Sequence, residues 1–189
     1  MAPPASFRFT PLGLPGLVLV EEKRIGDARG FFAETYRASA FRAGGIDASF
    51  VQDNYSRSTR GVLRGLHYQL PPRAQGKLIR VVQGEVFDVA VDLRRGSAGY
   101  GRWEATRLAG DDGRLLWVPP GFAHGYVVLS ETADLTYKVT AEFDPTLDRG
   151  IRWNDPAIGI EWPVERPILS ERDRVQPVLA DAGNPFVAE

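Results

Sequence analysis

The sequence predicts an all-β protein, a double-sheet jelly roll or barrel with an N-terminal extension and an irregular C-terminal segment. Three observations support this fold class. The chain carries 20 glycines and 14 prolines. Its apolar stretches are short and lie between turn signals at intervals typical of sandwiches and barrels. Helical periodicity is scarce, whereas apolar and polar residues alternate with period two in several segments. At 189 residues the chain is long enough to bury one sizeable core, so we expect a single domain over residues 1–189.

The elements follow in chain order. A short helix is expected over YRASAFRAGG (36–45), where two glycines end it. A β-hairpin is expected over residues 78–93, because Gly84 supplies the positive φ of a tight two-residue turn. A second pair of strands is expected over residues 115–130, with a corner at Pro119, Pro120 and Gly121.

Strict alternation over residues 133–143 predicts another strand. It places Ala133, Leu135, Tyr137, Val139, Ala141 and Phe143 on one face. A last short helix is expected at SERDRV (170–175), where Ser170 caps the first turn and Pro177 stops the helix.

Composition excludes several classes of protein. The 23 basic and 24 acidic residues are interspersed, so there is no electrostatic footprint for nucleic acid. No stretch approaches the roughly 18 apolar residues of a membrane span. The first 20 residues do not read as a secretory signal, so we expect a cytoplasmic protein. Without cysteine there is no thiol catalysis and no disulfide. The two histidines are far apart and form no H-x-H pair, so we expect no catalytic metal.

The stretch RGLHYQLPPRAQGKL (64–78) draws attention because it holds one of only two histidines. Alternation places His67 on the same strand face as Leu63, Gly65 and Gln69, and Lys77 returns beside that strand after a turn. Taken alone, each residue is also compatible with a purely structural role. Together they suggest a base beside a cation.

Other polar residues could complete a site. Period two sets the phenol of Tyr137 among apolar neighbours, where a hydroxyl needs a partner. His124 lies at a glycine-rich corner, and Arg29, Arg64, Gln52 and Asn54 could hold phosphate or sugar hydroxyls. With no nucleophile elbow or phosphate loop, these residues favour metal-free acid–base chemistry in a barrel, with a histidine base, a phenol and a lysine.

Six segments, in order from about residue 20 to about residue 180, resemble the dTDP-4-dehydrorhamnose 3,5-epimerase (RmlC-type) family. They are DARGFFAETY, FVQDNYS, GVLRGLHYQLPPRAQGKLIRVVQGEVFDVAVDLR, LLWVPPGFAHGYVVLS, TYKVT and IRWNDPAIGIEWP. The RGLHYQ, QGK and GFAHG blocks are the most specific. The resemblance implies a cupin-like jelly roll, no cofactor, a dTDP-sugar substrate, and a homodimer that exchanges an N-terminal strand.

The same resemblance implies roles for individual residues. His67 matches the general base, Asp173 the carboxylate that orients it, Tyr137 the acid on the opposite face of the sugar, and Lys77 the cation near the enolate oxygen. Substrate-binding positions fall on Arg29, Phe32, Glu34, Gln52, Asn54, Arg64, His124, Asp148 and Arg172. Arg29 is expected to serve the partner subunit's site.

Three positions depart from the family pattern. Arg172 stands where we expect lysine, Asp148 where we expect glutamate, and Tyr126 where we expect phenylalanine. These changes concern binding rather than the acid or the base. The expected activity is epimerisation at C3 and C5 of dTDP-4-keto-6-deoxy-D-glucose to dTDP-4-keto-L-rhamnose. The alternatives are a single-site epimerase of another dTDP-deoxysugar, a non-catalytic sugar-nucleotide-binding cupin and, more distantly, a metal-dependent cupin enzyme.

Overall fold

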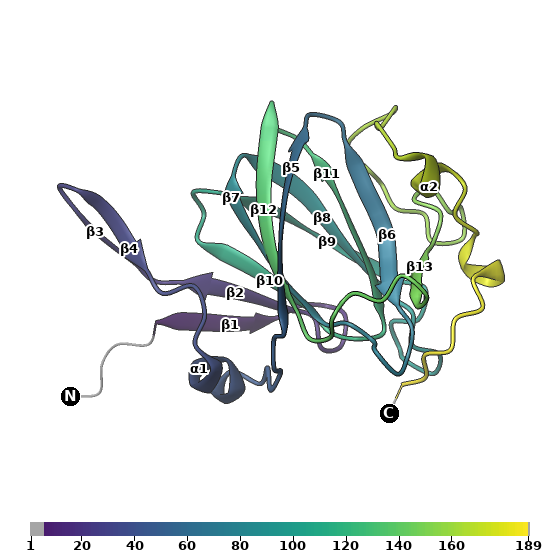
Figure 1. The fold of residues 1–189 in the computed structure, drawn as a ribbon, viewed down its shortest axis with the longest axis horizontal. Helices are drawn as coiled ribbons and strands as arrows, with labels where there is room; N and C mark the ends of the chain where they lie inside the picture. Colours follow the sequence, from purple (N-terminus) through teal and green to yellow (C-terminus); the bar gives the residue numbers. More distant parts are fainter. Residues whose placement is uncertain (1–5, 189) are drawn as a thin grey trace.

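The computed structural model describes residues 6–188. The prediction that the first 20 residues are not a secretory signal falls partly on residues 1–5, which lie outside the described residues. Two antiparallel sheets dominate the structure (Figure 1). The six-stranded sheet has the order β1 (Phe7–Pro11), β2 (Val18–Glu22), β10 (Arg114–Val118), β7 (Lys77–Gln83), β12 (Thr132–Val139) and β5 (Gln52–Thr59). The five-stranded sheet has the order β13 (Asp148–Gly150), β6 (Leu63–Gln69), β11 (Phe122–Val128), β8 (Glu85–Asp92) and β9 (Trp103–Ala109).

The inner faces of the two sheets enclose an apolar core. Ile79 and Leu135 come from the six-stranded sheet, and Val86 and Phe122 from the five-stranded sheet. All four side chains are at most 2% exposed. Period-two alternation sends every second residue of each strand into this layer. The predicted double-sheet jelly roll is therefore confirmed.

Both outer faces are partly covered. Helix α1 (Ala38–Ala43) sets Phe41 against Leu78 and Trp117 on the outside of the six-stranded sheet. The chain after β13 runs along the outside of the five-stranded sheet (Figure 1), where Ile151 and Phe186 contact its apolar face. This C-terminal segment also carries helix α2 (Glu171–Arg174) and the short 3-10 helix η1 (Leu179–Asp181).

Both predicted helices form where the sequence placed them. Helix α1 ends at Gly44 and Gly45, and Gly45 adopts a φ of +89°. The hydroxyl of Ser170 accepts the backbone N–H of Asp173 at 3.1 Å, which is the expected cap of α2. No helix within residues 6–188 is long and apolar enough to cross a membrane.

The predicted hairpin over residues 78–93 is wrong. Strands β7 and β8 follow each other through Gly84, which has the expected positive φ of +79°. However, β7 pairs with β10 and β12, whereas β8 pairs with β11 and β9 in the other sheet. A jelly roll requires the chain to cross between its sheets, and a crossing uses the same turn residues as a hairpin.

The same correction applies to residues 115–130. Strands β10 and β11 flank the Pro119–Gly121 corner but lie in different sheets. The strand expected over residues 133–143 ends at Val139, and Phe143 lies beyond it, 53% exposed. Alternation identified the strands but not their neighbours.

A two-stranded arm projects from the body on the N-terminal side (Figure 1). It consists of β3 (Arg24–Asp27) and β4 (Gly30–Ala33), and among the strands that the structure describes these two pair only with each other. At its tip Phe31 and Phe32 are 57% and 72% exposed. Two neighbouring exposed phenylalanines form an apolar patch, and such patches mark interaction surfaces more often than single exposed residues do.

Candidate active site

Two adjoining cavities open between the sheets, with volumes of about 450 and 310 Å³. Both are lined by His67, Lys77 and Tyr137, which come from β6, β7 and β12. The segment around α2 contributes Arg172 to both. The predicted base, cation and phenol thus meet between the two sheets.

A shift in strand register brings Arg64 and His67 to the same cavity. On β11, His124 pairs with His67 and Tyr126 pairs with Arg64, so β6 holds one extra residue between them. Gly65 lies in this stretch with a φ of +132°, and a Cβ there would be 2.6 Å from the Cα of Gly125. The expected strict alternation of β6 is wrong at this point, because only glycine fits the shift.

His67 is bound to a carboxylate far away in the sequence. Its Nε2 lies 2.6 Å from Oδ1 of Asp173, whose side chain is 4% exposed. Burial acts to raise the pKa of Asp173, but the hydrogen bond and charge of His67, the Ser170 cap and Arg172 together lower it. An ionised carboxylate only accepts hydrogen bonds, so Nε2 carries the hydrogen and Nδ1 is the basic nitrogen of this imidazole.

Lys77 lies next to this pair. Its Nζ donates a hydrogen bond to the backbone carbonyl of His67 at 3.1 Å. Burial lowers the pKa of this lysine from 10.5 to about 8, although the charges of Asp148 and Asp88 oppose the change. Near neutral pH the cavity therefore contains a buried ammonium group, suited to hold an oxyanion.

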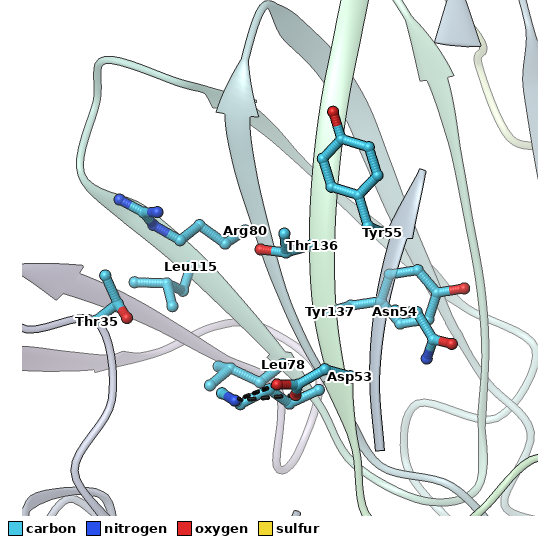
Figure 2. Close-up of a pocket in the computed structure, with 10 residues that line it drawn as sticks. Thr35, Asp53, Asn54, Tyr55, Leu78, Arg80, Leu115, Thr136 and Tyr137 are labelled. Atoms are coloured by element: carbon cyan, nitrogen blue, oxygen red, sulfur yellow. Dashed lines mark hydrogen bonds and ion pairs between the residues drawn. The ribbon is translucent and has the colours of Figure 1, made fainter. Parts of the chain in front are cut away.

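Tyr137 approaches from the facing sheet. It pairs with Asn54 of β5, and both side chains lie on the same side of the sheet, opposite to Arg80 and Thr136 (Figure 2). Burial raises the pKa of Tyr137, with the neighbouring Tyr126 adding to the effect. Its phenol is thus protonated at neutral pH and able to donate.

The opposite side of these strands carries another hollow, which Figure 2 shows. Leu78, Leu115 and Arg80 line it, and an ion pair of 2.9 Å between Lys138 and Asp53 crosses part of it. This hollow lies on the outer face of the six-stranded sheet. It does not hold the histidine, the lysine or the carboxylate of the site above.

Most of the predicted binding residues lie at the two cavities. Arg64 donates to the Ser58 hydroxyl at 3.0 Å, across from one sheet to the other. The amides of Gln52 and Asn54 bond to each other at 2.9 Å. Two further predicted residues form an ion pair of 2.5 Å, Arg172 on α2 with Asp148 on β13.

Three predicted binding residues lie elsewhere. Arg29 and Phe32 belong to the projecting arm, and Glu34 follows it. The Arg29 guanidinium pairs with Asp27 and its side chain is 89% exposed, while Glu34 pairs with Arg37. None of the three lines either cavity within this chain.

The structure adds residues that sequence reasoning missed. Val62, Leu63, Ile168 and Leu169 give one cavity an apolar rim, and no periodic pattern singled them out. Asp88 was also missed. Its two carboxylate oxygens each lie 2.9 Å from Nε2 of His124, and it is fully buried. A carboxylate between Val86 and Ala90 on the inward face of β8 was a signal in the sequence.

The site contains few metal-ligating groups. Within residues 6–188, no cluster of three or more histidine, aspartate or glutamate side chains has the arrangement needed to hold a metal ion. The groups present instead are two imidazole–carboxylate pairs, one ammonium and one phenol. Such groups bind oxyanions and transfer protons.

Comparison with known proteins gives consistent matches. The family model for dTDP-4-dehydrorhamnose 3,5-epimerase matches residues 11–181. The enzyme of that name from Pseudomonas aeruginosa is 55% identical over 175 residues, which cover 92% of this chain and 96% of the relative. The corresponding enzyme from Shigella flexneri is 52% identical over 161 residues, covering 85% and 89%.

A solved structure agrees closely. The dTDP-6-deoxy-D-glucose-3,5-epimerase of Legionella pneumophila, in complex with dTDP-4-keto-L-rhamnose, is similar with a TM-score of 0.92 and 43% identity. The match covers 97% of this chain and 99% of that one. The likeness therefore extends over sequence and fold together.

Proposed function

The chain belongs to the dTDP-4-dehydrorhamnose 3,5-epimerase family, and we infer that it is an isomerase that inverts C3 and C5 of dTDP-4-keto-6-deoxy-D-glucose. The product is dTDP-4-keto-L-rhamnose, the compound bound to the similar enzyme from Legionella pneumophila. The resemblance seen in the sequence is thereby confirmed. The roles of individual residues are our proposal.

The chemistry begins at the C4 ketone of the sugar. This carbonyl acidifies the hydrogens on C3 and C5, because the carbanion left after proton removal is delocalised onto O4 as an enolate. We assign proton removal to Nδ1 of His67, since Asp173 occupies Nε2. The imidazolium that forms is stabilised by the Asp173 carboxylate. The ammonium group of Lys77 stabilises the negative charge on O4.

Inversion requires a proton to return on the opposite face of the ring. We assign this role to Tyr137, because it lies on the six-stranded sheet while His67 lies on the five-stranded sheet opposite. A sugar held between the sheets would have the imidazole on one face and the phenol on the other. The raised pKa of Tyr137 keeps its proton available at neutral pH.

One observation carries the assignment. Nε2 of His67 and Oδ1 of Asp173 meet at 2.6 Å, and the His67 backbone also receives the Lys77 ammonium at 3.1 Å. Base, orienting carboxylate and oxyanion donor are thus held together before substrate arrives. Preorganised groups of this kind lower the barrier because little rearrangement is needed in the reaction.

We assign binding of the nucleotide part to the remaining polar residues at the cavities. A guanidinium fork matches phosphate oxygens, and Arg64 and Arg172 both line the larger cavity. The amides of Gln52 and Asn54 and the imidazole of His124 can bond to sugar hydroxyls or phosphate. The Asp148–Arg172 ion pair holds the guanidinium at the entrance.

We further propose a homodimer in which the arm of each subunit reaches the partner's site. Within residues 6–188 the arm pairs with no strand outside the hairpin, and its Phe31 and Phe32 are exposed. A second copy would cover these rings. This arrangement would also bring Arg29, Phe32 and Glu34 to a substrate that they cannot reach within their own subunit.

The function is tested by incubating the protein with dTDP-4-keto-6-deoxy-D-glucose in deuterated water and following the label by NMR. Deuterium at both C3 and C5, with formation of the L-rhamno product, is the expected result. Label at a single carbon would instead identify a single-site epimerase. Tight binding of dTDP without any exchange would identify a sugar-nucleotide-binding protein.

A further inference from the structure

Asp88 is a carboxylate buried in the apolar layer between the sheets. It lies in the middle of β8, a strand that pairs on both sides, and it is 0% exposed. Val86 and Ala90, two residues away on the same face, belong to the hydrophobic core. An ionised group in such a place is costly unless it is paired and hydrogen-bonded. The fold alone does not require a carboxylate here.

The partner of Asp88 is a residue of the site. Both carboxylate oxygens lie 2.9 Å from Nε2 of His124. His124 pairs with Ala90 on one side and with His67 on the other, so its side chain stands beside that of His67 in the cavity wall. Asp88 itself does not line either cavity. It reaches the site through His124.

Asp88 also acts on Lys77 through its charge. Burial lowers the pKa of Lys77 to about 8, and the charges of Asp148 and Asp88 are the ones that oppose this effect, while Arg172 adds to it. The charge of Asp148 is offset by Arg172 at 2.5 Å. Within residues 6–188, the hydrogen-bond partner of the Asp88 carboxylate is the His124 imidazole, and no guanidinium or ammonium group forms an ion pair with it.

Other charged or titratable groups surround Lys77, and they do not replace Asp88. The groups at the two cavities come from β6, β11, β12, β13 and α2; they are Arg64, His67, His124, Tyr137, Asp148, Arg172 and Asp173. Asp173 is paired with His67, and Asp148 with Arg172. Asp88 is the carboxylate whose charge is least offset by a fixed cation.

We propose that Asp88 is a positioning residue for this reaction, which holds the His124 imidazole in the cavity wall and supplies the negative charge that keeps the Lys77 ammonium group protonated. The proposal rests on the function assigned above, because it concerns the cation that stabilises the enolate. Asp88 does not touch the reacting atoms. It acts through two residues that line the cavity.

The test compares Asp88→Asn with Asp92→Asn. Asp92 is a matched control, because it lies on the same face of the same strand, is also fully buried, and bonds to Arg94 and Ser97 rather than to the site. The measurement is the rate at which cyanate carbamylates Lys77 at a series of pH values, read by mass spectrometry. Only the neutral amine reacts, and Lys23 and Lys138 serve as internal references.

In Asp88→Asn the midpoint of the Lys77 profile should fall by about one pH unit, which corresponds to about tenfold more neutral amine below the midpoint. In Asp92→Asn it should stay where it is in the unaltered protein. The alkaline limb of the pH profile of kcat should move with the Lys77 midpoint. A midpoint that is the same in both variants would overturn the proposal.

A second variant covers a failure of Asp88→Asn to fold. The double variant Asp88→Asn/His124→Gln removes the same charge, and its two amides can bond to each other. The Lys77 midpoint should fall by the same amount in this double variant, and an unchanged midpoint would again contradict the role proposed for Asp88. Labelling needs no turnover, so absence of deuterium exchange in the unaltered protein would refute the assigned function without deciding this question.

Discussion

Nε2 of His67 and Oδ1 of Asp173 lie 2.6 Å apart although the two residues are separated by 106 positions in the sequence. His67 is fixed by strand β6, and Asp173 by the capped turn of α2. The C-terminal segment brings the Asp173 carboxylate to strand β6. Backbone hydrogen bonds between Leu66 of β6 and Ile151 attach the start of this segment to the strand. The orientation of the base therefore depends on how the last quarter of the chain packs.

Replacing Asp173 by asparagine should lower kcat by about 10²–10⁴-fold, because the amide no longer orients His67 or stabilises its charged form. The dTDP affinity should change little. The check is steady-state kinetics together with a dTDP titration. Asp155→Asn is the control, since Asp155 is also buried in the C-terminal segment but bonds to backbone N–H groups instead. Equal losses of kcat in both variants would contradict the assignment.

Tyr137→Phe should separate proton removal from inversion. Deuterium should still enter the substrate, because His67 is intact, while formation of the L-rhamno product falls by at least about tenfold, especially at C5. NMR follows label and configuration in one sample. Tyr126→Phe is the matched control, since Tyr126 bonds to Ser56 and lines neither cavity. Full product yield from Tyr137→Phe would remove it as the acid.

Lys77→Met should make the protein more stable at pH 7. The folded state holds Lys77 with a pKa of about 8, against 10.5 as the ordinary value, so burying the ammonium group costs up to roughly 3 kcal/mol below pH 8. Between pH 8 and 10.5 the unfolded chain binds more protons at this residue than the folded chain. The stability of the unaltered protein should therefore rise there, and the advantage of the variant should disappear.

Urea unfolding at pH 7 and at pH 10 measures this difference. Lys23→Met, at an exposed position, should leave the free energy of unfolding almost unchanged at both pH values. If Lys77→Met were less stable than the unaltered protein at pH 7, the burial of the Lys77 ammonium group in the unaltered protein would not be destabilising. The same variant should lose most of its epimerase activity, since the charge on O4 is then unsupported.

If the arm serves the partner's site, mixing two inactive variants should restore part of the activity. Arg29→Ala and His67→Asn should each be nearly inactive alone. If the arm serves the partner subunit, half of the randomly formed dimers are mixed and contain one intact site, so about a quarter of the full activity should return. Light scattering checks that two copies are present.

A second mixture gives the control. His67→Asn mixed with Asp173→Asn should stay inactive, because both changes fall in the site of their own chain. Recovery in that mixture, or none in the first, would mean that Arg29 does not act in the partner's site. The exposure of Phe32 on the arm would then need another explanation.

Period two predicted much of the fold. Alternation from Ala133 to Val139 identified β12 and the face that it presents, and the glycines after α1 and the cap of α2 were found at their places. Strand partners were not predictable in the same way. Gly84 has the backbone conformation of a hairpin turn, yet the chain there crosses to the other sheet. The residues of a turn are the same whether the two strands that it joins pair with each other or lie in different sheets.

The site was predictable in its residue types but not in its geometry. His67, Lys77 and Tyr137 could be selected from their strands, and family resemblance added Asp173. The extra residue in β6, which turns Arg64 toward the cavity of His67, arises from contact of Gly65 with β11 and has no signature in local periodicity. Asp88 escaped notice because its importance depends on His124, 36 positions away.

The role of His67 as the base is tested most directly by the rate of deuterium entry at C3 and C5 in His67→Asn compared with the unaltered protein. Binding of dTDP, measured in parallel, shows that the variant is folded. A single base acting on both carbons predicts that exchange is lost at C3 and at C5 alike. Exchange at either carbon at an undiminished rate would contradict the assignment of His67 as the base.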